Sequence, residues 1–152
     1  MKVDTKTMGL IEVDERQKIT FPYGLFGFEE IKDYVLLDAE QEPFYWLQSI
    51  EKKQIAFILI NPFIFRKDYE VNAGSDELNE LNIDSGEKAL VFSIVTVPDE
   101  GSVTANLQGP LVINRETKKG KQAVLTDQRW HTKHDIMAEF AAMSAEQTGS
   151  KN

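Results

Sequence analysis

Hydrophobic and polar residues alternate with a period of two over most of this chain, in short runs that are rich in β-branched and aromatic residues. Stretches with turn chemistry, such as YGLFG, AEQEP and PDEG, separate these runs. Short strands at close spacing, without long helices between them, are typical of an antiparallel sheet that curls or closes. We therefore predict a mainly β fold, either a small single-domain β-barrel or a strongly bent antiparallel sheet. The predicted strands are Lys2–Thr7, Leu10–Val13, Lys18–Phe21, Tyr34–Asp38, Phe44–Ile50, Ile55–Asn61, Ala89–Val97, Val103–Leu107, Leu111–Asn114 and Gln122–Leu125.

One short segment, GSDELNELN, has helical spacing instead. Ser75 is a residue type favoured as a helix N-cap, and acidic residues fill the turn that follows it. Leu78 and Leu81 stand three positions apart, as they would on one helical face. We expect one or two helical turns that pack over one end of the barrel.

The C-terminal stretch TKHDIMAEFAAMSAEQ is also helical in pattern, because Ile136, Phe140 and Met143 recur at helical spacing. Such a tail either docks on the domain or frays, and the polar residues at its end are expected to be disordered. We divide the chain into a β-barrel domain over residues 1–135 and a helical or disordered tail over residues 136–152.

The stretch TANLQGPLVIN (residues 104–114) interrupts a strand pattern with polar and turn-forming residues. Pro110 cannot donate a ladder hydrogen bond, and Gly109 before it permits a sharp bend. We interpret the stretch as a strand, a kink and a second strand, with Asn106 and Asn114 tying the backbone at the kink.

Length and composition indicate one globular domain. With 152 residues, of which 41% are hydrophobic and 28% charged, the chain is long enough to bury a core and too apolar to be disordered. It has no cysteine, which excludes disulfides and thiolate catalysis. It shows neither a signal-peptide pattern nor an apolar run long enough for a membrane helix. We expect a soluble, cytoplasmic protein.

The net charge of −8 disfavours direct binding to nucleic acid. From Asp68 to Glu87 the chain carries seven acidic residues and neither lysine nor arginine. This acidic segment is either a solvated surface that keeps the protein soluble or a face that attracts a basic partner. A basic group in a predicted hairpin loop is either a solvated turn or a contact to an anion or RNA. It consists of Arg115, Lys118, Lys119 and Lys121.

A search for catalytic or phosphate-binding motifs in the sequence finds no familiar one. His131 and His134 are three positions apart, so a helix would bring them to one face. With Asp127 or Asp135 they make a candidate metal site for a small-barrel enzyme, but no other histidine or cysteine supplies a third ligand. A β-barrel nucleic-acid binder is the other alternative, and it would need a basic groove with stacking aromatics. We predict no catalytic, cofactor or metal site.

Three aromatic residues are candidates for contact with another protein. Phe63, Phe65 and Tyr69 follow the apolar strand that ends at Asn61, and Phe63 and Phe65 would share one face of an extended chain. These rings either belong to the core or form an apolar anchor for a partner beside the acidic segment. The predicted partner-binding residues are Phe63, Phe65, Asp68, Tyr69, Glu70, Asp76, Glu77 and Glu80.

Four segments together resemble the FliW family of flagellar assembly factors. They are ITFPYGLFGFEEIKDYVLL (19–37), FYWLQSI (44–50), FILINPFIFRKDYE (57–70) and TANLQGPLVINRETKKGKQAVL (104–125). Their order and spacing fit the family, and they span most of residues 1–135. Phe26 stands where the family usually has proline, and Gly109 stands where alanine is common. Both departures fall in turns, so they concern local turn geometry.

The resemblance implies a small β-barrel-like fold without enzymatic activity or cofactor. It also implies two protein partners: flagellin, held before export, and CsrA, a small RNA-binding translational repressor. In this family, binding of CsrA relieves repression of flagellin translation. Accumulating flagellin then occupies the factor and releases CsrA, so the partners switch by mass action. CsrA has to be basic where it grips RNA, and an acidic face suits such a partner.

Overall fold

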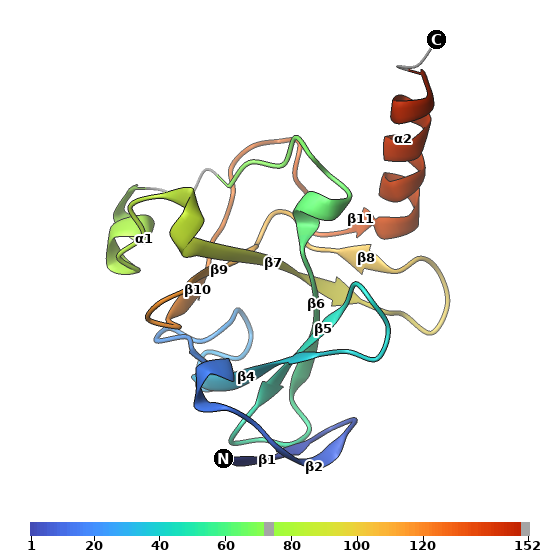
Figure 1. The fold of residues 1–152 in the computed structure, drawn as a ribbon. Helices are drawn as coiled ribbons and strands as arrows, with labels where there is room; N and C mark the ends of the chain where they lie inside the picture. Colours follow the sequence, from blue (N-terminus) through green and yellow to red (C-terminus); the bar gives the residue numbers. More distant parts are fainter. Residues whose placement is uncertain (72–74, 150–152) are drawn as a thin grey trace.

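The computed structural model describes residues 1–71 and 75–149, and the side chains of residues 1–71 and 78–145 (Figure 1). Strands dominate this part of the chain. They are β1 (Lys2–Thr5), β2 (Gly9–Glu12), β3 (Lys18–Thr20), β4 (Asp33–Asp38), β5 (Tyr45–Ser49), β6 (Ala56–Ile60), β7 (Ala89–Thr96), β8 (Thr104–Ala105), β9 (Leu111–Asn114), β10 (Gly120–Gln122) and β11 (His134–Asp135). The helical elements are the short 3-10 helices η1 (Glu15–Gln17), η2 (Pro62–Ile64) and η3 (Gly86–Lys88) and the α-helices α1 (Ser75–Glu80) and α2 (Ile136–Gly149).

The strands pair in antiparallel ladders. β1 and β2 form a separate hairpin, and the main sheet has the order β10-β9-β7-β6-β5-β4-β3, with β8 and β11 attached through β7. The long strand β7 links the two ends of the fold. Its first half pairs with β9, with Leu90 opposite Ile113, and its second half pairs with β6 and β8.

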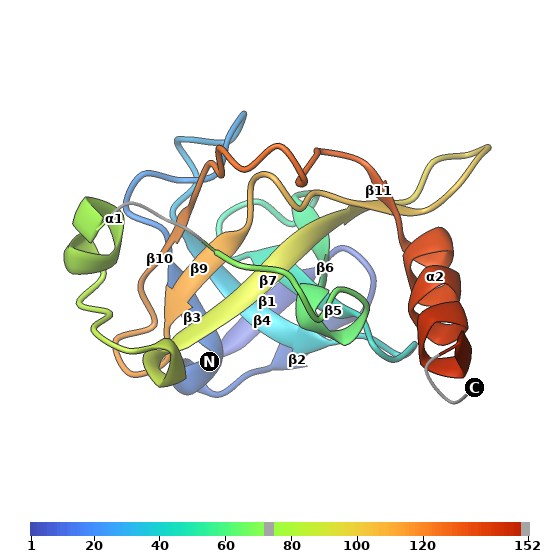
Figure 2. The same ribbon diagram turned by 90° about the horizontal axis from the view of Figure 1, so that it is seen from above.

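The main sheet bends until its edge strand β3 reaches the loop between β9 and β10 (Figure 2). The N–H of Thr20 donates a 2.9 Å hydrogen bond to the carbonyl oxygen of Lys118, and one isolated bridge pairs Thr20 with Lys119. Over the described residues, β3 and β10 do not continue this contact as a ladder. The predicted strongly bent antiparallel sheet is therefore confirmed, and the barrel is not closed.

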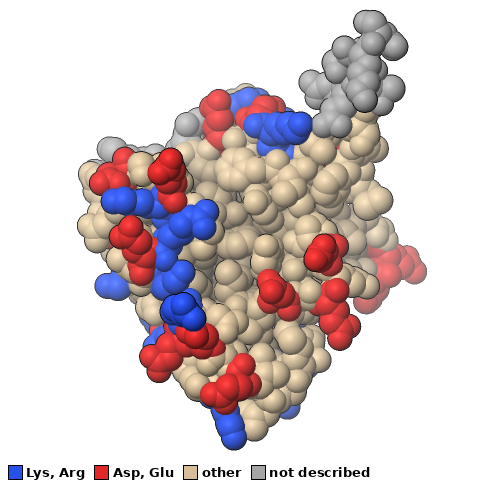
Figure 3. Space-filling model, viewed as in Figure 1, with Lys and Arg blue, Asp and Glu red and all other residues tan. Residues whose placement is uncertain are grey.

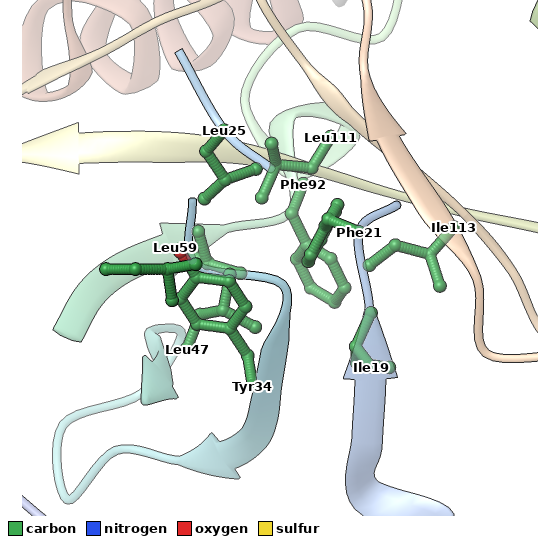
Figure 4. Packing of buried hydrophobic residues seen from close by; sticks show 10 residues of the cluster. Ile19, Phe21, Leu25, Tyr34, Leu47, Leu59, Phe92, Leu111 and Ile113 are labelled. Carbon is green, nitrogen blue, oxygen red and sulfur yellow. The ribbon is translucent and has the colours of Figure 1, made fainter. Parts of the chain in front are cut away.

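The concave side of the bent sheet encloses the main core. Figure 4 shows its side chains converging from strands β3 to β7, from β9 and from the segment between β3 and β4. A glycine is required at position 120, because a Cβ there would lie 2.7 Å from Cε1 of Phe21 and 2.9 Å from Cγ1 of Ile113. The labelled residues of this cluster are Ile19, Phe21, Leu25, Tyr34, Leu47, Leu59, Phe92, Leu111 and Ile113.

A second core cluster joins the segment after β6 to the start of α2. Its buried members are Ile60, Phe65, Tyr69, Val95, Ala105, Leu107, Leu125, Trp130 and Ile136. The rings of Phe65 and Phe140 lie 5.6 Å apart, which brings the second turn of α2 onto the same cluster. The C-terminal helix therefore docks on the domain through its first turns.

The rest of α2 extends along one edge of the molecule beyond β8 and β11 (Figures 1 and 2). Met137, next to the buried Ile136, is 71% exposed, and Met143 is half-buried. Within the described residues, no helix is long and apolar enough to cross a membrane.

Most predicted strands are present with trimmed ends, but two regions differ. The predicted strand Gln122–Leu125 begins earlier, as β10, and ends at Gln122. Ala123 and Leu125 instead bond the backbone of the bend between β8 and β9, at Pro110 and Gln108. The two-residue strand β11 was not predicted, because it exists only through its pairing with β8 and is too short for a period-two pattern.

The stretch from residue 104 to residue 114 is a strand, a bend and a second strand, as predicted. Oδ1 of Asn106 accepts hydrogen bonds from the N–H groups of Gln108 (3.1 Å) and Gly109 (2.8 Å), so Asn106 holds the bend. The predicted role of Asn114 at the bend is wrong. Its Oδ1 caps the following turn, and its Nδ2 donates a 2.7 Å bond to the carbonyl oxygen of Leu81.

Helix α1 occupies the predicted helical segment, at Ser75–Glu80. Leu78 is half-buried and Leu81 is buried, in a small cluster with Val112 and its neighbours. The predicted N-cap role of Ser75 concerns a side chain outside the described residues.

Candidate protein-interaction site

The segment after β6 turns instead of continuing as a strand. Pro62 cannot donate a ladder bond, and Oδ1 of Asn61 accepts a 2.9 Å hydrogen bond from the N–H of Phe63, which starts the 3-10 helix η2. The expected shared strand face of Phe63 and Phe65 is therefore wrong. The turn leaves Phe63 41% exposed and buries Phe65 to 1% exposure.

Tyr69 is a core residue that also makes a buried hydrogen bond. Its side chain is 3% exposed, and its hydroxyl donates a 2.6 Å bond to the carbonyl oxygen of Leu107. Burial raises the pKa of the Tyr69 hydroxyl above its usual range. Its ring lies 4.8 Å from Trp130 and 5.7 Å from Phe63. Of the three predicted aromatic anchors, Phe65 and Tyr69 belong to the core, and Phe63 presents a ring at the surface.

Two arginines make cation–π contacts with the Trp130 ring. The guanidinium carbons of Arg66 and Arg129 each lie 4.8 Å from its centroid. Arg66 binds both carboxylate oxygens of Asp68, at 2.8 and 2.9 Å, and reaches Oε2 of Glu139 in α2 at 3.1 Å. The hydrogen bonds from Arg66 hold the pKa of Asp68 below its usual value. This network fastens the segment after β6 to α2.

Basic residues from other parts of the chain neutralise much of the acidic segment. Glu80 lies 3.4 Å from Nζ of Lys121, and Glu70 lies 3.8 Å from Nη2 of Arg129. Asp84 pairs with Lys88 at 3.1 Å. Sequence reasoning missed the pairs with Lys121 and Arg129, because both residues are far from the segment along the chain. Asp76 and Glu77 are on α1, and their side chains lie outside the described residues.

The two histidines come together, but not on a helix. The rings of His131 and His134 stack 5.3 Å apart, and α2 begins only at Ile136. Nε2 of His134 accepts a 2.8 Å hydrogen bond from the N–H of His131, and Nδ1 lies 3.1 Å from Oε1 of Glu139. Both ring nitrogens of the buried His134 are thus engaged within the protein.

The two aspartates considered as metal ligands also have other partners. Asp127 binds the guanidinium of Arg129 at 2.8 Å, and Asp135 caps α2 by accepting a 3.0 Å bond from the N–H of Ala138. That backbone bond lowers the pKa of Asp135. Over the described residues, no group of three His, Asp or Glu side chains is placed to hold a metal ion.

The predicted basic group lies in and beside the β9–β10 loop. Arg115 donates to the carbonyl oxygen of Glu87 at 3.0 Å, and Lys121 reaches Glu80. Figure 3 shows basic and acidic side chains mixed along this side of the molecule, near α1 and β10. The group is therefore part of a surface of alternating charge.

An open cleft of about 410 Å³ lies on the opposite side of the molecule. It is bounded by the β1–β2 turn, the β4–β5 loop and the adjoining ends of β7 and β8. Sequence reasoning missed it, because its apolar residues come from separate hairpins and each belongs to an ordinary strand pattern. Those residues are Met8, Phe44, Trp46, Ile58, Val97 and Val103.

A strongly bent sheet with an exposed ring, a charged network and an open apolar cleft is typical of a small β protein that acts through contacts with other proteins. The comparisons with known proteins agree. The model of the FliW protein family matches residues 2–136. This chain belongs to the FliW family of flagellar assembly factors, so the resemblance stated from the sequence is confirmed.

Individual relatives match almost the whole chain. The flagellar assembly factor FliW of Treponema denticola is 50% identical over 143 residues, which cover 93% of this chain and 97% of that protein. The FliW of Treponema pallidum is 45% identical over 148 residues, covering 97% and 99%. A crystal structure of the flagellar assembly factor FliW is similar with a TM-score of 0.81 at 38% identity, covering 90% of this chain and 96% of that one.

Proposed function

We propose that this chain is a non-enzymatic flagellar assembly factor that binds two proteins, flagellin and the translational repressor CsrA. The observation that carries the proposal is the match to named flagellar assembly factors over 93% and 97% of the chain. The net charge of −8 supports a basic protein partner and disfavours direct contact with nucleic acid.

In this proposal the partners switch by mass action. The free factor binds CsrA and relieves repression of flagellin translation. Newly made flagellin then occupies the factor, and the released CsrA represses translation again. The factor does this in the cytoplasm, without a cofactor and without binding a membrane.

We further propose that the acidic segment and the neighbouring ring of Phe63 form part of the CsrA surface. Phe63 is the exposed apolar element, and Phe65 and Tyr69 support its turn from the core. Asp68 and Glu80 share their charge with Arg66 and Lys121. Glu70 is held more loosely, 3.8 Å from Nη2 of Arg129, and its side chain is 64% exposed. We include Asp76 and Glu77 in this surface because they lie in the same acidic segment of the sequence.

Calorimetric titration of the full chain with purified CsrA and purified flagellin tests the function. Both proteins are expected to bind, and flagellin added to the preformed CsrA complex is expected to release CsrA. If the chain binds neither protein, the proposed function is wrong.

Charge reversal tests the proposed surface. Glu70→Lys/Glu77→Lys is expected to weaken CsrA binding about tenfold at low salt and to flatten its salt dependence. The control is Glu51→Lys/Glu116→Lys, which makes the same change in net charge at exposed residues outside the segment. Unchanged CsrA binding by the first variant would remove the segment from the interface and leave the function intact.

A further inference from the structure

The cleft beside the β4–β5 loop has an apolar lining that the fold leaves partly open. Val97 is 58% exposed and Met8 is 37% exposed, and the rings of Phe44 and Trp46 are half-buried at its floor. The lining belongs to four different hairpins, so the cleft exists only in the folded chain. Exposed apolar surface of this kind, gathered in a concavity, is typical of a binding site.

The charge around this cleft is almost entirely negative. Five exposed carboxylates stand in the two hairpins that flank it. Asp38 ends β4, Glu40 and Glu42 lie in the β4–β5 loop, and Asp99 and Glu100 lie in the β7–β8 loop. Over the described part of the chain, the ion pairs involve other residues than these five. Figure 3 shows acidic side chains without basic neighbours on that side of the molecule. Lys6 in the β1–β2 turn adds a single positive charge to this rim.

This arrangement differs from that of the acidic segment. There, Arg66, Arg129, Lys121 and Lys88 already hold much of the negative charge in ion pairs. Over the described residues, the carboxylates at the cleft are outside these ion pairs, so they can interact with an incoming molecule. Unpaired negative charge therefore lies next to the protein's open apolar surface.

We propose that this cleft docks a segment of a partner protein in which lysine or arginine residues flank one or two large apolar side chains. The apolar side chains contact Met8 and Val97, and the basic residues meet the carboxylates of the two loops. A second copy of this chain fits less well, because it would bring two acidic rims together. The same field repels nucleic acid and anionic small molecules. The inference rests on the proposed function as a factor that binds other proteins.

The two features of the cleft have separate kinetic signatures. Rim carboxylates exposed to solvent act mainly on the association rate and on its salt dependence. The apolar lining acts mainly on the dissociation rate, because its contacts form only in the docked complex. The two kinds of variant described next can therefore be told apart by kinetics.

Surface plasmon resonance with the immobilised full chain tests the inference, with the two partner proteins proposed above as probes. Glu40→Lys/Glu42→Lys changes the rim, and the matched control is again Glu51→Lys/Glu116→Lys. Val97→Ser changes the lining. Its control is Val124→Ser, the same substitution at a residue that is 56% exposed and lies outside the cleft. Thermal unfolding checks that each variant is folded.

We expect the rim variant to weaken binding of one probe about tenfold, chiefly through slower association, and Val97→Ser to weaken it several-fold through faster dissociation. Both controls are expected to stay within about twofold of the unchanged chain. If the unchanged chain binds a probe and both cleft variants bind it equally well, the docking site is elsewhere and the function stands. If the unchanged chain binds neither probe, the proposed function fails, and the docking inference fails with it.

Discussion

The hydroxyl of Tyr69 donates a 2.6 Å hydrogen bond to the carbonyl oxygen of Leu107, thirty-eight positions further along the chain. Leu107 lies at the bend between β8 and β9, and Tyr69 lies in the segment that follows β6. The bond therefore ties the candidate interaction segment to the sheet at the place where the strand pattern breaks.

Tyr69→Phe should destabilise the fold without changing its shape. The variant leaves the Leu107 carbonyl buried without this donor, which costs about 1–2 kcal/mol. Urea unfolding followed by circular dichroism measures the change, and Tyr23→Phe at a residue that is 60% exposed serves as the control. Equal midpoints for Tyr69→Phe and the unchanged chain would mean that the bond contributes nothing to stability.

Truncation of Phe65 and truncation of Phe63 should have very different effects on stability. Truncating the buried Phe65 to alanine is expected to cost about 3–4 kcal/mol, because it leaves a cavity in the second core cluster. Phe63→Ala at the half-exposed ring is expected to cost less than about 1 kcal/mol. Denaturant unfolding of both variants measures this difference. A large loss of stability in Phe63→Ala would show that its ring is part of the core.

The Arg66–Asp68 pair should make stability depend on pH in the acid range. The pKa of Asp68 in the folded chain is lowered from its usual 3.8, mainly by the hydrogen bonds from Arg66. The ionised carboxylate therefore stabilises the fold above pH 3.8, and this contribution is lost as the pH falls through the lowered pKa.

Asp68→Asn removes that ionisation. The difference in unfolding free energy between Asp68→Asn and the unchanged chain should be present at neutral pH and should shrink as the pH falls below about 4. Urea unfolding at a series of pH values from neutral to acid measures it. A difference that stays constant over the whole pH series would contradict a lowered pKa of Asp68 in the folded chain.

Two glycines should respond oppositely to alanine. At Gly120 a Cβ would lie 2.7 Å from the Phe21 ring, so Gly120→Ala is expected to destabilise by about 1–3 kcal/mol through overpacking. At Gly86 nothing lies within 4 Å of an added Cβ. Gly86→Ala is therefore expected to be neutral or to stabilise by up to about 1 kcal/mol, because it restricts the unfolded chain. Thermal unfolding of both variants measures the two effects. Equal shifts of the unfolding temperature in the same direction would contradict the packing argument.

Helix α2 should loosen when its docking contacts are removed. Phe140→Ser breaks the ring contact with Phe65, and Glu139→Gln removes the charge that faces Arg66. Both changes are expected to speed amide hydrogen exchange in residues 136–145 and to leave the strands protected. Met137→Ser at the exposed face is the control. Unchanged exchange in Phe140→Ser would mean that other contacts hold the helix.

Local pattern was enough to predict most of the strands, both α-helices and the bend at Gly109 and Pro110. These features depend on periodicity and on the backbone restrictions of glycine and proline, which are properties of neighbouring residues. The short strand β11 was not predicted, because its partner Ala105, which pairs with it in the ladder, is distant in sequence. The closure contact between Thr20 and Lys118 is of the same kind.

The candidate site was harder to predict. From the sequence, Phe63, Phe65 and Tyr69 were either core residues or an anchor for a partner, and only the turn that starts at Asn61 and Pro62 separates them. The acidic segment was visible, but its partners Arg129 and Lys121 were not. The cleft had no signal at all in the sequence, because its lining is collected from four hairpins.

The sequence alone thus determined a small antiparallel β fold, an acidic surface and membership of the FliW family, since each is carried by composition, periodicity or ordered segments of the chain. Folding decided which aromatic rings are buried, which carboxylates are neutralised and where open apolar surface meets unpaired negative charge. Burial and ion pairing depend on which distant segments come into contact, and long-range packing sets those contacts.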